Sequence, residues 1–418
     1  MDNEEKLLEI KRKGFIWNFL GSVITAISSV MTLMIVKRFA GIEVGAYYSI
    51  AVAVSNVMIN IGTLNVIGFQ ISDIREKYSF NIYLNLRKMS IFLMLLVSLV
   101  YVLCEEYSLM KGIIVYMYCI YRAVYAYADV FQGRYQQKGR VDLAGKMQFM
   151  KVLFPDGTLI ICTIVSGKII YAIICAMIVE LTLIFMYNKK YLHEYISKEE
   201  IEKRKYFDLL WHCLPLFFSA FATTYIMNSS KYAIDKLLSN EMQVYYSILL
   251  LPATVVHMIA GFIYRPVITD YAALWENSKI KNFVIRIIKV IFFIFVCTIV
   301  VEIAGVLLGI PILEWLYAAP KLREYVEVFV ILLLAGGLNA LNTFMIFVIT
   351  IMRAQNHMVW IYGIALAISI ELPEVLIKRS GMVGAATSYL LLMVFQLSMI
   401  FIVFLKKLKC KSEITNLD

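Results

Sequence analysis

The chain has 418 residues, of which 61% are hydrophobic and 17% charged, and its mean hydropathy is +0.76. One water-soluble core cannot bury so much apolar surface, so the composition excludes an ordinary soluble protein and indicates a membrane protein. The formal net charge of +10 does not indicate a nucleic-acid partner, because the basic residues stand in short clusters between apolar runs.

Twelve apolar runs are long enough to cross a bilayer as α-helices, because a hydrocarbon core about 30 Å thick needs roughly 20 apolar residues. They cover residues 15–36, 44–69, 89–104, 109–131, 147–166, 168–188, 208–230, 242–268, 283–309, 325–351, 357–377 and 382–405. The third run is short, so we expect its helix to extend into the flanking polar sequence. The sequence predicts an all-α integral membrane protein with about 12 transmembrane helices.

Lysine and arginine counts predict the orientation of these helices. With the N-terminus inside, the inner segments and adjoining span ends hold 28 basic residues and the outer ones hold 10. Cytoplasmic segments of membrane proteins retain positive charge, so we expect both termini to be cytoplasmic. The first run lacks a cleavage-site pattern and exceeds signal-peptide length, so we expect it to stay in the mature protein.

A short repeat divides the chain into two halves. Residues 43–50, Glu-Val-Gly-Ala-Tyr-Tyr-Ser-Ile, align with residues 241–248, Glu-Met-Gln-Val-Tyr-Tyr-Ser-Ile, and both copies open an even-numbered run. We therefore predict two six-helix bundles, joined by a cytoplasmic linker and related by an axis along the membrane normal. The predicted bundles are residues 1–190 and 208–418, and the linker is 191–207.

Several chemistries have no counterpart in the sequence. It contains no GxxxxGK[ST] phosphate loop, which disfavours a self-contained ATP-driven pump, and no HExxH motif, which disfavours a zinc enzyme of that type. The seven cysteines are scattered without a CxxC spacing, and we interpret them as packing residues. No large polar loop is present to carry the carboxylates of a glycosyltransferase. We therefore expect no catalytic site, no bound metal and no cofactor.

Ionisable residues within the runs are the candidate functional groups, because each costs about 2.5–3.5 kcal/mol at the bilayer centre. Arg122 and Asp129 lie seven residues apart in the fourth run, so they share a helix face with Tyr125. That face either binds substrate or fixes helix packing. Arg265 precedes Pro266, which can kink the eighth helix, and it either lines a moving cavity or extends its side chain to the inner surface.

The remaining charged residues leave similar alternatives open. Lys231 and Asp235 are four residues apart, so they either form a surface ion pair or take part in binding and coupling. Glu180 and Glu302 could carry a coupling proton, or could lie near an interface or pair with arginine. Lys151 and Asp156 flank Pro155 and mark a possible break in the fifth helix.

Local motifs resemble those of a transporter family. They are residues 11–21 before the first run, Gly41-x-x-x-Gly45-x-Tyr-Tyr, Leu214-Pro215, Asn228-x-x-Lys-Tyr-x-Ile-Asp235, and the stretch 245–266 that ends in Phe-Ile-Tyr-Arg-Pro. The chain resembles the bacterial polysaccharide transporters, Wzx-type flippases of the multidrug/oligosaccharidyl-lipid/polysaccharide exporter superfamily. The two additional helices of the related peptidoglycan-precursor flippases are not evident in the sequence.

The resemblance implies two six-helix bundles around a central, cationic cavity in the bacterial cytoplasmic membrane. It implies a polyprenyl-diphosphate-linked oligosaccharide as substrate, turned to the outer leaflet for capsule, exopolysaccharide or O-antigen assembly. It also implies a proton or sodium gradient as driving force, with a polysaccharide polymerase or glycosyltransferases as possible partners. The alternatives are a multidrug/cation antiporter of the same superfamily and, ranked lower, a membrane glycosyltransferase or polymerase.

Within this hypothesis, each candidate residue has a role. Arginines in the cavity would replace the hydration of the diphosphate. The candidate substrate-binding residues are Arg122, Tyr125, Asp129, Lys231 and Arg265. The candidate ion-coupling residues are Glu180, Asp235 and Glu302.

Overall fold

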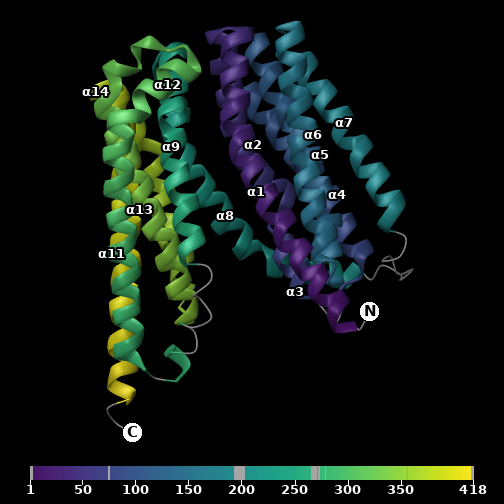
Figure 1. The fold of residues 1–418 in the computed structure, drawn as a ribbon, viewed down its shortest axis with the longest axis vertical. Coiled ribbons are helices and arrows are strands. Elements are labelled where there is room, and N and C mark those ends of the chain that lie inside the picture. Colours follow the sequence, from purple (N-terminus) through teal and green to yellow (C-terminus); the bar gives the residue numbers. More distant parts are fainter. Residues whose placement is uncertain are drawn as a thin grey trace. The chain divides into compact units, whose positions relative to one another are not determined.

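A computed structural model describes residues 3–73, 76–192, 203–264, 271, 274–277, 279–354 and 356–415. All regular elements in these ranges are helices, with no strand among them, which confirms the predicted fold class. The chain divides into two compact units, Met1–Phe221 and Ala222–Asp418 (Figure 1). The boundary between the units falls within one helix, α8.

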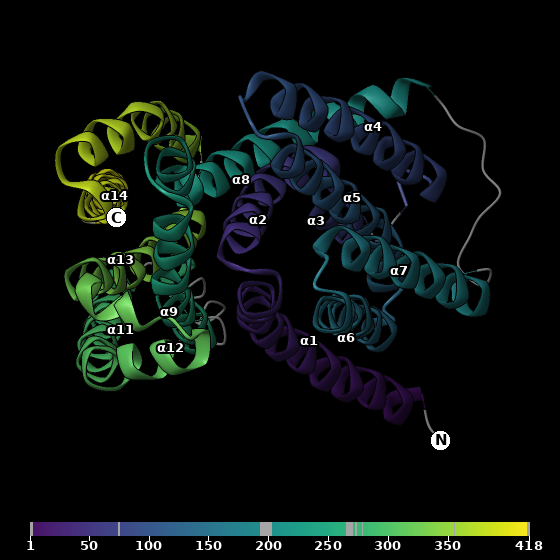
Figure 2. The same ribbon diagram turned by 90° about the horizontal axis from the view of Figure 1, so that it is seen from above.

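The first unit is a bundle built on three central helices. Its elements are α1 (Asn3–Ala40), α2 (Ile42–Thr63), α3 (Val66–Ser72), α4 (Phe80–Cys104), α5 (Leu109–Gln137), α6 (Val141–Ser166), α7 (Ile169–Tyr191) and the first part of α8 (Lys203–Leu237). Helix α1 lies along α6, while α2 and α4 pack on α5, and α7 contacts both α5 and α6 (Figure 2). Helices α5, α6 and α7 therefore pack on one another, and the other helices of this unit pack against them.

The second unit is organised around α13. Its elements are the rest of α8, then α9 (Asn240–Tyr264), α11 (Ile280–Ala304), the π-helix η3 (Gly305–Gly309), α12 (Ile310–Tyr317), the 3₁₀ helix η4 (Pro320–Tyr325), α13 (Val326–Ile351) and α14 (Asn356–Thr415). Helix α13 packs against α9, α11 and α14. A Cβ added at Gly336 would lie 2.7 Å from the Ala253 carbonyl oxygen, so a glycine is required where α13 approaches α9.

Helix α14 contains a sharp reversal of the chain. Ser380 and Gly381 have non-helical backbone angles, and Gly381 has a φ of 58° that favours glycine. A Cβ at Gly384 would lie 2.1 Å from the carbonyl oxygen of Leu376, eight residues earlier. Residues eight apart in a straight helix are about 12 Å apart along the axis, so the two parts of α14 are antiparallel neighbours.

Each of the twelve predicted runs coincides with helical structure over the residues that the structure describes. Ten helices there are long and apolar enough to cross a membrane, and the reversal divides one of them, α14, into the two parts predicted as separate runs. Helix α9 accounts for the predicted run 242–268 as far as Tyr264. Helix α4 begins at Phe80, which confirms the predicted extension of the short third run. Helix α6 continues through Pro155, so the predicted break was wrong.

The two copies of the repeat make the same local contact. Tyr47 donates a hydrogen bond to Glu43 at the start of α2, and Tyr245 donates one of 2.8 Å to Glu241 at the start of α9. In each case the partners are four residues apart and so lie one above the other on the helix. The sequence match therefore extends to equivalent side-chain geometry.

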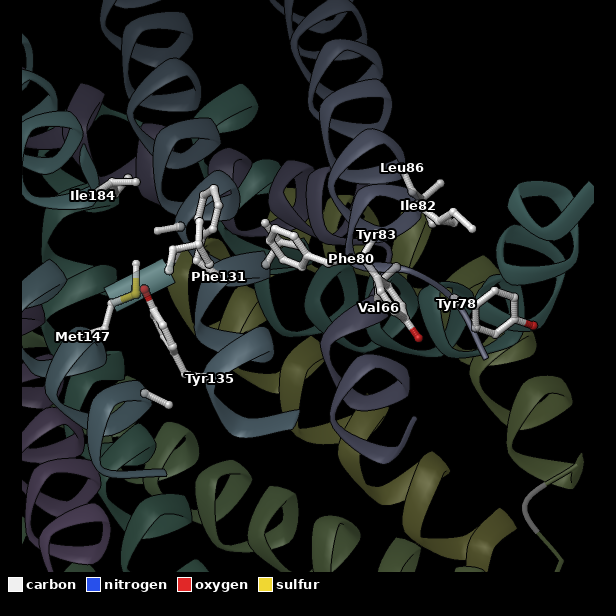
Figure 3. Close-up of a cluster of buried hydrophobic side chains, with 14 of the residues drawn as sticks. Val66, Tyr78, Phe80, Ile82, Tyr83, Leu86, Phe131, Tyr135, Met147 and Ile184 are labelled. Atoms are coloured by element: carbon white, nitrogen blue, oxygen red, sulfur yellow. The ribbon is translucent and has the colours of Figure 1, made fainter. Parts of the chain in front are cut away.

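One end of the first unit holds a large hydrophobic cluster (Figure 3). It combines the segment between α3 and α4 with the ends of α5 and α7 and the starts of α6 and α8. Phe80 and Phe131 pack with ring centroids 5.9 Å apart, and Tyr135 and Tyr187 pack at 5.7 Å. These chain segments are the ones that the charge count predicts on the same, inner side of the membrane, and the structure places them at one end.

Ion pairs surround this cluster in the segment before α4. Arg134, 1% exposed at its side chain, donates to Glu76 at 3.2 Å, and Lys138 also pairs with Glu76. The Asp73 carboxylate accepts hydrogen bonds from the backbone of Lys77 and Tyr78. Partial burial raises the pKa of Glu76, but Lys138 and Arg134 outweigh it, and the net pKa is below the usual value.

Glu76→Gln is expected to make the protein less sensitive to acid. A lowered folded-state pKa means that ionised Glu76 contributes stability above its unfolded pKa of about 4.3. That contribution is lost as the pH falls through the lower pKa that Glu76 has in the folded protein. At pH 7 the wild type should therefore melt at a modestly higher temperature than the variant. The difference in melting temperature should disappear as the pH is lowered to 3. For the exposed control Glu106→Gln, the difference in melting temperature from wild type should not change with pH. The same pH-independent difference for Glu76→Gln would contradict this role.

Candidate functional site

Four ionisable side chains that interact electrostatically around Glu180 lie among the apolar helices of the first unit. They are Arg122 on α5, Lys151 and Asp156 on α6, and Glu180 on α7. Glu180 is fully buried and Lys151 is 3% exposed, while Arg122 and Asp156 are partly buried. We call these four residues the buried charge set. Such groups are retained at membrane depth only where partners or a function compensate for their cost.

Asp156 is held by hydroxyl groups from two other helices. Tyr121 on α5 donates a hydrogen bond of 2.8 Å to its Oδ1 atom, and Ser28 on α1 donates to its Oδ2 atom. The carboxylate therefore joins α1, α5 and α6 at one point. Both carboxylate oxygens of Asp156 therefore have a hydrogen-bond donor.

Both cations of the buried charge set lie against the ring of Tyr125. The Lys151 Nζ atom is 3.8 Å from the centre of that ring, and the Arg122 guanidinium carbon is 4.5 Å from it. Gln148 donates a 3.2 Å hydrogen bond to the Tyr125 hydroxyl. A cation over an aromatic face is attracted by the ring quadrupole, most strongly where water is excluded. The ring thus stabilises two like charges that would otherwise repel.

Glu180 differs from Asp156 in its hydrogen bonding. It interacts electrostatically with Lys151, Arg122 and Asp156. Within the described part of the chain, however, neither Glu180 oxygen has a hydrogen-bond partner, and neither does Lys151 Nζ. A buried carboxylate without donors is stabilised by protonation or by an entering cation. The buried charge set has two positive and two negative groups when ionised, so protonation of Glu180 changes its net charge.

Asp129 takes part in a different ion pair. The Arg87 Nη2 atom on α4 lies 3.1 Å from its Oδ2 atom, and Arg87 Nη1 donates a 2.7 Å hydrogen bond to the Gly62 carbonyl. Arg87 is 2% exposed. Ser90 donates to the same carbonyl at 2.6 Å. The interaction holds α4 against the end of α2 and against α5, and it was not predicted from the spacing of Arg122 and Asp129.

The other predicted site residues belong to the second unit or lie outside the described ranges. Lys231 and Asp235 occupy adjacent turns of α8, and both are partly buried. Glu302 is partly exposed near the end of α11. Arg265 lies outside the described residues. The structure thus brings together three of the predicted residues, Arg122, Tyr125 and Glu180, and their assignment to binding or coupling stays a prediction.

Sequence reasoning did not assign Lys151, Asp156, Tyr121 or Ser28 to this site. Lys151 was counted with the inner segments, whereas the structure buries it at the eleventh position of the 26-residue helix α6. A signal was present, since a lysine and an aspartate five residues apart interrupt an apolar run. No group of three or more histidine, cysteine or acidic residues is placed to hold a metal ion in the ranges that the structure describes.

Comparisons with known proteins identify relatives by fold. No protein-family model matches the chain, and no curated protein matches it in sequence. The lipid II flippase MurJ in an inward closed conformation is similar with a TM-score of 0.70 and 15% identity, over 94% of this chain and 90% of that one. The Vibrio cholerae MATE transporter VcmN is similar with a TM-score of 0.63 and 12% identity, over 97% and 98%.

A eukaryotic MATE transporter, AtDTX14, is also similar, with a TM-score of 0.63, 12% identity and coverage of 97% and 99%. Other similar structures are described as multidrug resistance MATE transporters of the MOP superfamily. These neighbours are transporters and flippases rather than enzymes. The chain is therefore a multi-pass, all-helical membrane protein with the fold of MATE and MurJ transporters of the MOP superfamily.

Proposed function

We propose that the chain is a flippase for a polyprenyl-diphosphate-linked oligosaccharide in the bacterial cytoplasmic membrane. The observation that carries the proposal is the guanidinium of the partly buried Arg122, stacked on Tyr125, with buried Lys151 against the same ring. Arginine binds phosphate through paired, charge-assisted hydrogen bonds. The similarity in fold to a lipid II flippase supports a lipid-linked substrate. Both termini lie in the cytoplasm in this proposal, as the positive-inside rule predicts.

Glu180 is the proposed coupling group. A proton that enters from the ion gradient would neutralise its carboxylate and leave the buried charge set with a net positive charge. That charge would then favour the anionic diphosphate at Arg122, so proton binding and substrate binding would be linked. The exported glycan would pass to a polysaccharide polymerase or glycosyltransferase for capsule, exopolysaccharide or O-antigen assembly.

Deletion and complementation test this function. A strain that lacks the chain should accumulate a lipid-linked oligosaccharide in the inner leaflet, and the wild-type chain should remove it. Arg122→Gln should fail to restore export, with at least a tenfold loss, although the protein is present in the membrane. Lys88→Gln, which changes an exposed lysine on α4, is the matched control and should restore it. Absence of any accumulated glycolipid would refute the proposal.

A multidrug/cation antiporter is the second candidate, favoured by the two carboxylates of the buried charge set, Asp156 and Glu180. Acidic groups attract cationic substrates and would be expected to bind drugs of that class. Resistance to cationic dyes conferred by the wild-type chain and lost in Asp156→Asn, without glycolipid accumulation in the deletion strain, would favour this candidate.

A further inference from the structure

The second unit carries an open hollow of about 580 Å³ where α12 turns into η4. It is lined by Pro311, Glu314, Trp315, Ala318, Pro320 and Arg323. Its volume lies in the range of pockets for small ligands. We call it the α12–η4 hollow.

The backbone around the hollow is fixed by its sequence. Ala318 adopts a left-handed conformation with a φ of 47° that ends α12, and the Ala319 N–H donates to the Glu314 carbonyl at 3.1 Å. Pro311 and Pro320 stand at the starts of α12 and η4, where their fixed φ angles suit the first turn. A rim restrained in this way loses little entropy when a ligand binds.

Three side chains give the hollow its chemistry. Trp315 is 77% exposed and offers a flat apolar ring face. The Arg323 Nε atom donates a 2.7 Å hydrogen bond to Glu314 Oε2, and the arginine side chain is 71% exposed. Glu314 is only 12% exposed, and its Oε1 atom has no hydrogen-bond partner among the described residues. The hollow therefore combines an aromatic surface, a buried acceptor oxygen without a partner among the described residues and an exposed donor group.

The charges in the hollow restrict the class of ligand. The Glu314 carboxylate disfavours a phosphate or another anion, and the Arg323 guanidinium disfavours a cation. A neutral molecule with many hydroxyl groups fits both, because hydroxyls donate to the carboxylate and accept from the guanidinium. The apolar face of a pyranose ring matches the tryptophan face. A tryptophan that only anchors the protein at the membrane interface would need no buried carboxylate oxygen without a hydrogen-bond partner beside it.

We infer that the α12–η4 hollow binds a neutral pyranose oligosaccharide, stacked on Trp315 and hydrogen-bonded to Glu314 and Arg323. The identity of the ligand rests on the proposed function: it is the glycan of the transported lipid. The hollow lies between the predicted ninth and tenth membrane spans, and the predicted orientation places this segment outside. The glycan thus binds there after it has crossed the membrane.

Binding of released glycan tests the site. The lipid-linked oligosaccharide that accumulates in the deletion strain is cleaved at its diphosphate by mild acid, and the free glycan is titrated against the full chain in nanodiscs. Saturation-transfer NMR should detect weak binding, and Trp315→Ala should reduce the affinity at least tenfold. Trp360→Ala is the matched control, since Trp360 on α14 is 76% exposed, and it should bind like wild type.

Two outcomes would overturn the inference. One is equal binding by wild type and Trp315→Ala, and the other is no binding of the released glycan to the wild type. Accumulation of the glycolipid would then still support the proposed function. If no glycolipid accumulates, the proposed function fails, and titration with maltohexaose and chitotetraose decides the site alone. Binding of either sugar that is lost in Trp315→Ala supports it, and binding of neither refutes it.

Discussion

Glu180→Gln is expected to abolish ion-coupled transport while the first unit remains folded. Glutamine has the shape of the protonated glutamate, a state that the coupling cycle itself requires, so the fold should tolerate it. The variant can no longer release a proton between Lys151 and Arg122. Substrate movement in proteoliposomes should fall at least tenfold and should no longer respond to a pH gradient.

The control for this experiment is Glu106→Gln, which changes an exposed glutamate in the segment between α4 and α5. It should transport like wild type and respond to the gradient. Transport by Glu180→Gln that still follows the imposed pH gradient would remove Glu180 from the coupling mechanism. In that case Asp235 and Glu302 would be the remaining predicted carriers.

Stability measurements examine the same charges independently. Lys151→Met should destabilise the protein by about 3–5 kcal/mol, because it removes one partner from a buried set of charges. In the Glu180→Gln background the same change should be less costly, since the carboxylate that needed Lys151 has gone. A double-mutant cycle measures this difference by denaturation in mixed detergent. Additive effects would show that the two side chains do not interact.

The second large effect is expected at Arg87, which should contribute more to stability than any exposed ion pair. Arg87→Met would leave the Asp129 carboxylate and the Gly62 carbonyl without their shared donor inside the bundle. The expected cost is about 3–5 kcal/mol in the free energy of unfolding. Arg87→Lys should restore only part of it, because an ammonium group cannot reproduce the two-pronged contact of a guanidinium.

Unfolding in mixed detergent again provides the measurement, with Lys88→Met on the exposed side of α4 as control. The control should change the stability by less than about 0.5 kcal/mol. If Arg87→Met behaved like Lys88→Met, the pair with Asp129 would not stabilise the bundle. A combined Arg87→Met and Asp129→Leu variant should recover part of the loss, because no buried charge then remains unpaired.

The membrane-spanning helices were predictable from the sequence because the lipid environment places the same requirement on every span. A segment in hydrocarbon must satisfy its backbone internally and present apolar side chains, so each run of suitable length forms a helix. The short run 89–104 illustrates this, since α4 extends to Phe80 as its length required. The reversal at Ser380 likewise falls in the short interval between the predicted runs 357–377 and 382–405.

The partners of the buried charges were not predictable in the same way. Helical spacing places Arg122 and Asp129 on one face of α5, but seven residues separate them by about 10 Å along the axis. At those two depths α5 meets different neighbours: Asp129 meets Arg87 on α4, whereas Arg122 lies near Lys151 and Glu180. Only the packing of the bundle decides which helix lies opposite a given turn.

The two-residue reversal in α14 has a consequence for biogenesis. With only Ser380 and Gly381 between them, the last two spans have no loop that could be threaded separately through the insertion machinery. We expect them to enter the bilayer together as a helical hairpin. In the predicted orientation, such an insertion step carries the adjacent Lys378 and Arg379 across the membrane. Concerted entry thus accounts for a basic pair on the side that the charge rule disfavours for lysine and arginine.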